Sequence, residues 1–236
     1  MECFIVSRED IAGSELTIRG EEAHHALKSL RLRPGESLLA TDLDGTSFEC
    51  KYIGETEKNL NCQIVRVLPN FGEPSRDVLL IQGMIAQPAR WEFLLEKATE
   101  LGATSIMPVI TEWTEQRHLR MDRSDRILRA AVKQTKRSRL PKLIVSGNGE
   151  LMSFEEALTL AKQQRREIIL LHDEAATPIW PSSSQSIALV VGPEGGFTPD
   201  EIALARDQFG ARLASLGSRR LRAETAAIAA LAVLSL

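Results

Sequence analysis

The stretch "GPEGGFTPDE" at residues 192–201 decides the fold class. It follows the apolar run "IALVV" at 187–191 and leads into a segment of helical character, so it joins a buried strand to a helix. In open α/β sheets, ligands bind at the carboxyl ends of strands, and glycines let a backbone approach a ligand closely. The stretch therefore predicts a parallel sheet with a ligand site at this turn. A tight turn that only reverses the chain is the alternative.

Strands alternate with helices through most of the chain after residue 73, as a mainly parallel sheet requires. Ser153 and Glu156 form the pattern of a capping box at one helix start, and Gly102 is well placed to end another helix. The predicted strands are 77–85, 105–110, 142–146, 167–173, 186–192 and 211–217. The predicted helices are 89–103, 124–138, 153–164, 198–209 and a terminal helix that begins at Arg222.

The first seventy residues have a different pattern, with short runs rich in β-branched and aromatic residues between turns. One helical segment, 20–32, interrupts these runs, and "PNFGEP" at 69–74 has the composition of a linker. The predicted strands are 3–7, 14–18, 37–43, 47–54 and 60–68. We therefore predict two domains, a small β-rich domain at 1–72 and an α/β domain at 73–236.

Composition narrows the class of protein. The chain has 236 residues, a formal net charge of −3 and three widely spaced cysteines with no zinc-binding pattern. A general nucleic-acid-coating protein is therefore not expected, although a local basic face is compatible with this charge. The N-terminus lacks a signal-peptide pattern, and the apolar run 226–236 is too short to span a bilayer. We expect a cytoplasmic protein with reduced thiols, no metal and no membrane contact.

Two further segments carry polar groups at strand ends: "LLHDE" at 170–174, and "LGSRRLRAETAAIAALAVL" at 216–234. Three such loops can converge on one pocket. The glycine-rich motifs of dinucleotide-binding and of nucleoside-triphosphate-binding loops are both absent from the sequence. Pro193 also has no backbone N–H with which to bind a phosphate. Glu224 in the first turn of the terminal helix also fits an ordinary role opposite the helix dipole.

Together, "GPEGGFTPDE" and "LGSRRLRAETA" (216–226) resemble the signature of the ribosomal RNA small subunit methyltransferase E family, which belongs to the SPOUT class. The segments 96–111 and 130–143 resemble the same family, and 24–38 resembles its PUA-like domain. The resemblance implies a trefoil-knotted, parallel-sheet α/β domain preceded by a small PUA-like β-barrel that binds RNA. It also implies a homodimer.

The resemblance implies a pocket for the cofactor S-adenosylmethionine, with a wall made largely of rigid backbone groups. Glycines would leave room for the ligand. Carried over by position, the cofactor-binding residues are Leu171, His172, Gly192, Pro193, Glu194, Gly195, Gly196, Leu216, Leu221, Thr225 and Ala226.

The activity that the resemblance implies is methylation of N3 of a uridine in 16S ribosomal RNA of the small ribosomal subunit. Arg222 is the expected group that stabilises the uracil anion, with Arg220 as a weaker choice, and Glu194 or Glu224 is the candidate base. A structural role for Glu224 stays open. The alternatives are a related enzyme with another target, such as the ribose 2′-oxygen, or a non-catalytic RNA-binding or ribosome-assembly protein.

RNA binding requires basic surface, and two segments supply it. One is the basic helix and the residues that follow it, and the other lies near the N-terminus. The predicted RNA-binding residues are Arg8, Lys28, Arg31, Arg33, Arg129, Lys133, Lys136, Arg137 and Arg139. The chain departs from the family at Gln87, where a lysine is common, and at Trp113, where arginine is frequent. Trp113 is expected either to stack on a base or to pack against a second copy.

Overall fold

The computed structural model describes residues 1–180 and 182–235. The chain divides into two compact units, Met1–Glu73 with Arg129–Leu140, and Pro74–Leu128 with Pro141–Leu236. The units therefore differ from the predicted domains, 1–72 and 73–236, at residue 73 and in the segment 129–140. We keep the two predicted domains as a proposal. Along the described residues, no helix is long and apolar enough to cross a membrane.

The first unit contains a six-stranded sheet in the order β1-β4-β5-β6-β3-β2. Its neighbouring strands are antiparallel except for β1 and β4. The strands are β1 (Cys3–Ile5), β2 (Ile11–Ala12), β3 (Glu15–Ile18), β4 (Ser37–Thr41), β5 (Thr46–Thr56) and β6 (Asn59–Pro69). The helical segment expected at 20–32 forms α1 (Gly20–His24) and the π-helical η2 (His25–Ser29).

The core of the first unit is apolar and includes all three cysteines. Cys3, Cys50 and Cys62 are all buried, with free thiols. Burial raises the pKa of each of these thiols to about 12, so they are uncharged at neutral pH. Cys50 and Cys62 pack as small apolar side chains in the same cluster as Phe4 and Leu60.

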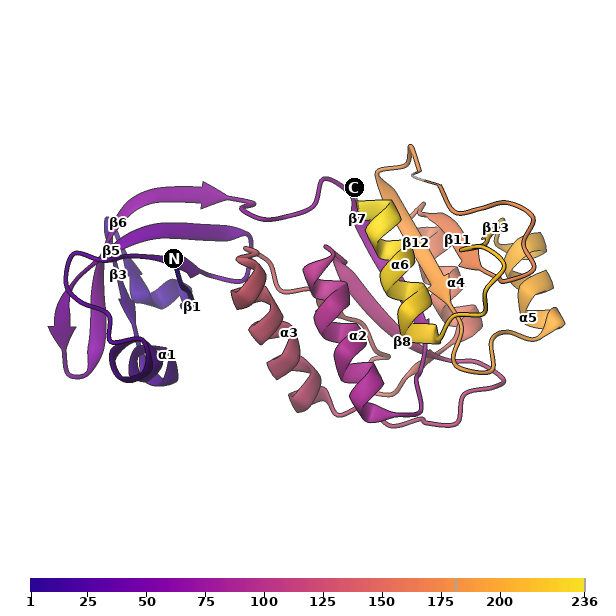
Figure 1. Ribbon diagram of the computed structural model, residues 1–236, viewed down its shortest axis with the longest axis horizontal. Coiled ribbons are helices and arrows are strands. Elements are labelled where there is room, and N and C mark those ends of the chain that lie inside the picture. The colour runs from indigo at the N-terminus through magenta and orange to yellow at the C-terminus, as the bar shows by residue number, and fades with distance from the viewer. Residues whose placement is uncertain (181, 236) are drawn as a thin grey trace. The chain divides into compact units, whose positions relative to one another are not determined.

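The second unit is built on a parallel sheet in the order β10-β8-β7-β12-β11-β13, with β9 paired to β8 (Figure 1). The parallel α/β class that the sequence predicts is confirmed. The strands are β7 (Asp77–Gly83), β8 (Ser105–Ile110), β9 (Lys142–Leu143), β10 (Met152–Ser153), β11 (Glu167–Leu171), β12 (Ser186–Val191) and β13 (Arg212–Ala214).

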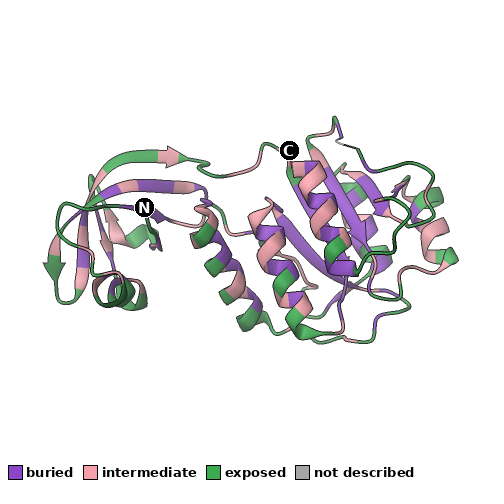
Figure 2. Cartoon of the chain, viewed as in Figure 1, coloured by how far each residue is buried: buried purple, intermediate pink, exposed green. Residues whose placement is uncertain are grey.

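Helices cover both faces of this sheet. α6 packs against α2, β7 and β12, whereas α4 packs against β8 and β11. The helices of the second unit are α2 (Pro88–Glu100), α4 (Phe154–Gln163), α5 (Pro199–Ala203), the π-helical η3 (Leu204–Gln208) and α6 (Ala223–Ser235). Helix α3 (Met121–Thr135) begins in the second unit and ends in the first. Central strands such as β12 are buried on both faces because helices lie on each side, and they appear purple in Figure 2.

Helix ends follow local chemistry. Ser153 and Glu156 form a reciprocal capping box at the start of α4, as predicted, and Thr198 and Glu201 form a second one at α5. Gly102 has φ +87° just after α2, which suits the end of a helix. The helix expected at 124–138 instead spans Met121–Thr135, because the backbone turns left-handed at Lys136 (φ +60°). The trefoil knot that the family resemblance implies stays a prediction.

Candidate functional site

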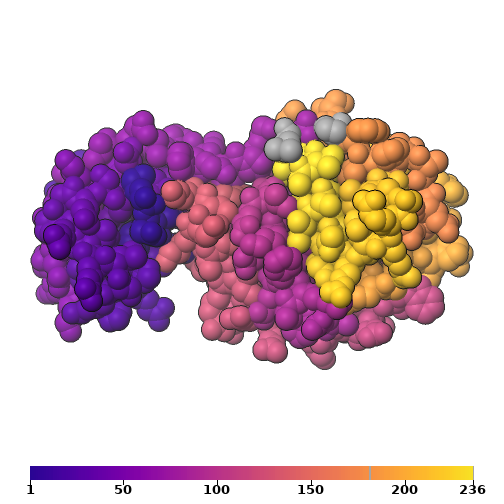
Figure 3. Space-filling view, viewed as in Figure 1, coloured from indigo at the N-terminus to yellow at the C-terminus, as the bar shows by residue number. Residues whose placement is uncertain are grey.

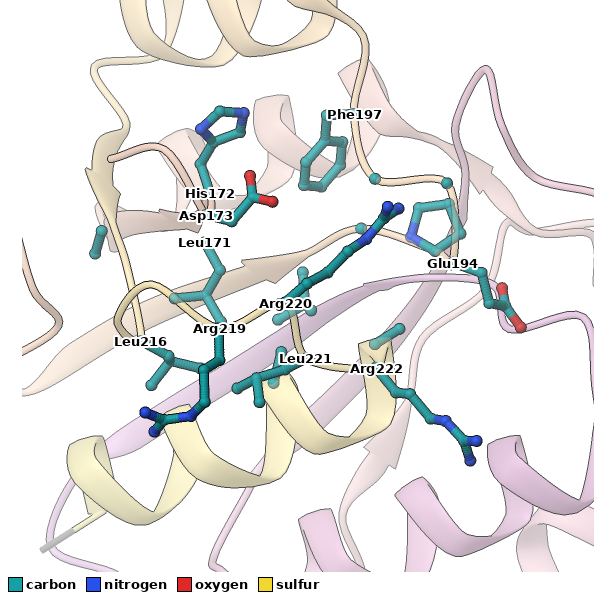
Figure 4. Close-up of a pocket in the computed structure, with 18 of the residues that line it drawn as sticks. Leu171, His172, Asp173, Glu194, Phe197, Leu216, Arg219, Arg220, Leu221 and Arg222 are labelled. Atoms are coloured by element: carbon teal, nitrogen blue, oxygen red, sulfur yellow. The ribbon is translucent and has the colours of Figure 1, made fainter. Parts of the chain in front are cut away.

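Three loops at the carboxyl ends of β11, β12 and β13 line a pocket of about 550 Å³ (Figure 4). They are the segments that the sequence predicts to converge. The loop after β11 contributes Leu171, His172 and Asp173. The loop after β12 contributes 191–197, and the loop after β13 contributes most of 214–223. Parallel strands bring their carboxyl ends to one edge, so this convergence follows from the sheet direction.

The glycine-rich turn forms one wall of the pocket. Gly196 N donates a hydrogen bond to Pro193 O (3.0 Å), and Gly196 adopts φ +76°, a conformation that glycine favours. The amide of Gln82 at the end of β7 donates to Gly192 O at 3.0 Å. A Cβ on Gly83 would lie 2.4 Å from Pro193 Cδ, so the neighbouring strand packs directly against the turn. The turn is therefore held from two sides.

The loop after β11 is also fixed by backbone contacts. His172 N donates to Ala214 O at 2.9 Å, which joins this loop to the end of β13. The backbone N–H of Glu174 donates to Nδ1 of the same histidine (3.3 Å). Leu171 and His172 are both half-buried at the pocket. Two of the three loops are thus linked to each other before any ligand binds.

The third loop brings positive charge to the pocket. Arg219, Arg220 and Arg222 line it and are all exposed. In Figure 4, Arg220 extends toward Phe197, whereas Arg222 extends away from Phe197. Ala226 N donates to Arg222 O (2.8 Å), so Arg222 lies directly at the start of α6. The pocket can therefore stabilise negative charge on a bound group.

Ten of the eleven predicted cofactor residues line this one pocket. They are Leu171, His172, Gly192, Pro193, Glu194, Gly195, Gly196, Leu216, Leu221 and Ala226. The remaining residue, Thr225, is exposed in the first turn of α6 and is not among the lining residues. Its position suits a residue at a helix start better than a cofactor contact.

The two glutamates proposed as bases differ in their surroundings. Glu194 lines the pocket and is exposed, and its carboxylate accepts a hydrogen bond from Ala86 N at 3.1 Å. Glu224 is buried in the first turn of α6 and is not a lining residue. Its Oε1 lies 3.7 Å from Arg90 Nε, and its buried Oε2 has no hydrogen-bond partner among the described residues.

Arg90 lines the pocket but was not among the predicted site residues. It lies in the first turn of α2, shortly after the carboxyl end of β7, so α2 adds a fourth contribution to the pocket. The sequence did place Arg90 after the end of a strand, which is a common position for a site residue. The missing information was its pairing with Glu224, which is 134 residues away along the chain.

The residues present fit S-adenosylmethionine. The pocket lies within the volume range of about 300–1,000 Å³ that is typical for small-ligand sites. Its glycine wall leaves little room for side chains, since a Cβ on Gly192 would lie 3.0 Å from Gly196 Cα. Among the residues that the structure describes, no cluster of three histidine, cysteine, aspartate or glutamate side chains could hold a metal.

All nine predicted RNA-binding residues belong to the first unit. Several already have partners: Arg8 pairs with Asp44, Lys133 with Glu22 at 2.7 Å, and Arg139 donates to Asn70 at 2.9 Å. Arg129 and Lys136 are half-buried. Three members of the set, Lys28, Arg31 and Arg33, are exposed and make no ion pair that involves the described residues.

The assignment of Arg137 to an RNA-contacting surface is wrong. Its side chain is only 2% exposed, and its guanidinium donates to Glu73 Oε2 at 2.8 Å. The same carboxylate accepts from the backbone N–H of Ser138 and of Arg139, each at 2.8 Å. The helix ends before Arg137, so the spacing of a continuous helix does not apply there. Arg137 is a structural residue of the first unit.

Comparisons with known proteins agree with this geometry. A family profile described as an RNA methyltransferase domain matches residues 72–235, and one described as an RNA methyltransferase PUA domain matches residues 18–65. The chain is similar to ribosomal RNA small subunit methyltransferase E of Mycobacterium bovis, with 30% identity over 97% of this chain and 88% of the relative. The Bacillus subtilis protein of that name is 25% identical over 93% of this chain and 89% of its own.

A solved structure gives the same picture in three dimensions. The fold matches ribosomal RNA small subunit methyltransferase E from Neisseria gonorrhoeae, crystallised with S-adenosyl methionine, with a TM-score of 0.83. The sequences are 26% identical, and the match covers 98% of this chain and 95% of that one. On the sequence motifs, the pocket and these matches, the chain belongs to the ribosomal RNA small subunit methyltransferase E family of RNA methyltransferases.

Proposed function

We propose that this chain is an enzyme that uses S-adenosylmethionine to methylate N3 of a uridine in 16S ribosomal RNA of the small ribosomal subunit. The observation that carries the proposal is the convergence of three strand-end loops on one pocket, with ten of the residues expected from the family at its wall. The Neisseria gonorrhoeae relative, with a TM-score of 0.83, was crystallised with this cofactor.

The backbone of the loops after β11, β12 and β13 would hold the cofactor. Gly192, Gly195 and Gly196 would leave room for it, and Leu171, Leu216 and Leu221 would contribute apolar contact. When bound, S-adenosylmethionine supplies a methyl group activated by a sulfonium. The loops are joined to one another through hydrogen bonds such as His172 N to Ala214 O, so the pocket is largely formed in advance.

N3 of uridine carries a proton and is a poor nucleophile until that proton leaves. A positive side chain near the uracil oxygens stabilises the anion as it forms, and we propose Arg222 for this role with Arg220 as its neighbour. Glu194 is the candidate proton acceptor, because it is an exposed acidic residue among those that line the pocket. Holding N3 in line with the methyl group would supply several further kcal/mol of barrier reduction.

Glu224 is better explained as a positioning residue. It is buried, does not line the pocket and lies 3.7 Å from the Arg90 guanidinium, which does line it. We propose that Glu224 holds Arg90 at the pocket. A buried carboxylate without that partner would be costly, so the two residues are expected to act as a pair.

We propose the first unit as the RNA-binding part, with Lys28, Arg31 and Arg33 as its accessible cations. The profile of an RNA methyltransferase PUA domain covers the same region. Phosphate contacts of this kind do not read sequence, so they position the RNA rather than select the uridine. Because the substrate is ribosomal RNA, we also propose that the protein works in the cytoplasm, where ribosomes assemble.

We further propose a homodimer formed through α6. This helix is apolar on nearly all sides, and Ile228, Ala229, Ala232 and Val233 are only half-buried within one chain. Figure 3 shows α6 and the preceding loop, in yellow, at the surface of the second unit beside α2. A helix that is hydrophobic all round is normally buried completely, so a second copy is the expected cover.

The function is tested by methyl transfer to undermodified small subunits with isotope-labelled cofactor, followed by identification of the product nucleoside. Label in 3-methyluridine is the expected result. Label in a ribose-methylated nucleoside would favour the related enzyme with another target. No incorporation, together with retained RNA binding, would favour the non-catalytic reading. Gly195→Trp, whose Cβ would lie 2.7 Å from Trp113 Cβ and so force the glycine-rich turn to shift, should abolish both cofactor binding and transfer.

A further inference from the structure

Trp113 is an exposed aromatic residue directly beside the glycine-rich turn. The residue is 55% exposed. A Cβ placed on Gly195 would lie 2.7 Å from Trp113 Cβ and 3.1 Å from its Cγ, so the tryptophan lies against that glycine. Gly195 itself lines the pocket, whereas Trp113 does not. The indole is therefore at the rim of the candidate cofactor site rather than inside it.

The turn that carries Trp113 is firmly built. It follows β8, and Thr111 and Thr114 on either side of the tryptophan are both buried. Thr111 N donates to Thr114 Oγ1 at 2.9 Å, Thr114 N donates to Thr111 O at 3.1 Å, and the two hydroxyls lie 3.0 Å apart. These contacts fix the backbone at the position from which the indole projects.

A second set of contacts joins this turn to the loop after β12. Glu112 N donates to Glu201 Oε1 at 2.9 Å. Glu201 belongs to the capping box of α5, which begins shortly after the glycine-rich turn. The residue before Trp113 is thus bonded to the helix that follows the glycine-rich turn, and Trp113 itself lies against Gly195 of that turn. Such an arrangement keeps a large apolar ring in water at a defined place.

Packing of the core does not explain why the Trp113 ring is exposed. Another tryptophan of the same unit, Trp91, is 3% exposed and contributes to the core. Nucleobases stack on exposed aromatic rings whatever their sequence, and phosphates require cations nearby. Arg117 and Arg120, a few residues further along the same loop, are exposed and supply such charge. The combination suits a strand of single-stranded RNA.

We propose that Trp113 stacks on a base of the RNA strand at the rim of the pocket, next to the nucleotide that enters it. A neighbouring base is the appropriate partner because Trp113 lies outside the pocket lining. The ring is thereby a substrate-positioning residue: it holds the strand so that the target base reaches the methyl donor. This proposal rests on the proposed function in assuming an RNA substrate.

The test compares Trp113→Ala and Trp113→Phe with Trp180→Ala, a control at another exposed tryptophan of the same unit (63% exposed). KM for RNA, kcat, cofactor affinity and sedimentation are measured for each. Loss of one stacked base, worth about 1–3 kcal/mol, should raise the RNA KM of Trp113→Ala roughly 5- to 150-fold. Trp113→Phe should recover most of the loss, and Trp180→Ala should match the wild type.

A second measurement reads stacking without catalysis. In a Trp91→Phe, Trp180→Phe background, a short uridine-containing oligonucleotide should quench the fluorescence of Trp113. An unchanged RNA KM in Trp113→Ala, absent quenching, or a change in sedimentation with RNA binding intact would overturn the proposal, the last in favour of a contact between two copies. If the wild type transfers no methyl group, the proposed function fails, but quenching still decides the role of Trp113.

Discussion

The pocket and the basic surface, which consists of the predicted RNA-binding residues of the first unit, are formed by different kinds of chemical group. The pocket wall is largely backbone, with glycines at 192, 195 and 196 and main-chain hydrogen bonds between loops. The basic surface depends on side chains, and several of those side chains are engaged by acids of their own unit. Arg8 with Asp44, Lys133 with Glu22 and Arg137 with Glu73 are examples.

This difference shows which kind of site a sequence motif describes well. A glycine turn between a strand and a helix has few alternative conformations, so its pattern specifies its place and shape. A basic residue is free to bind RNA or to pair with a carboxylate distant in sequence, and its spacing does not distinguish the two. Arg137 belongs to the second group, since its partner Glu73 is 64 residues away.

Arg137→Ala has the largest expected effect and tests whether this arginine is a buried structural residue. It leaves the buried Glu73 carboxylate without its cation and should lower the free energy of unfolding by about 3–5 kcal/mol. Arg66→Ala breaks the exposed pair with Glu49 and should cost at most about 1 kcal/mol. Chemical denaturation measures both. Equal, small changes would show that Arg137 is a surface cation after all.

Arg222→Ala tests a position where the proposed chemistry depends on a side-chain charge rather than on backbone groups. Removing a group that stabilises developing negative charge should lower kcat roughly 100- to 1,000-fold. Cofactor affinity and the melting temperature should stay near those of the wild type, because Arg222 is exposed. Arg206→Ala, at an exposed arginine paired with Asp207, is the matched control. Near-normal turnover in Arg222→Ala would remove its assigned role.

Gly196→Ala tests whether the backbone shape of the turn matters on its own. No atom lies within 4 Å of the added Cβ, so the cost is the left-handed conformation alone, about 1–2 kcal/mol. If the turn relaxes to avoid this strain, cofactor binding should weaken by up to about tenfold, as calorimetry can measure. Gly196→Asn should be milder. Gly147→Ala, where φ is not left-handed, should behave as the wild type.

Lys28→Ala and Arg33→Ala should have the smallest effects on the fold, within about 0.5 kcal/mol of unfolding free energy. Each should reduce the slope of log affinity against log salt by about 0.7 for single-stranded RNA. Lys51→Ala, an exposed lysine of the same unit outside the proposed set, is the control. Unchanged salt slopes in both variants would move the RNA surface elsewhere.

Much of the fold was predictable because hydrophobic periodicity and end signals are local. The strand at 105–110 and the capping box at Ser153 occur as expected. The ends of elements were less predictable: the helix expected at 124–138 stops at Thr135, where Lys136 adopts a positive φ. In the site, ten cofactor residues share the pocket, whereas Arg90 was missed because its pairing with Glu224 is long-range.

The sequence by itself determined the parallel α/β class, the glycine turn and the loops that line the pocket, because these depend on short-range pattern and on the common direction of parallel strands. Tertiary structure alone decided which charged side chains remain accessible. Arg137 is buried in an ion pair with Glu73, Glu224 is buried beside Arg90, and Trp113 lies against Gly195. The reason is physical: a charge or an aromatic ring takes its role from neighbours that only the folded chain brings within contact distance.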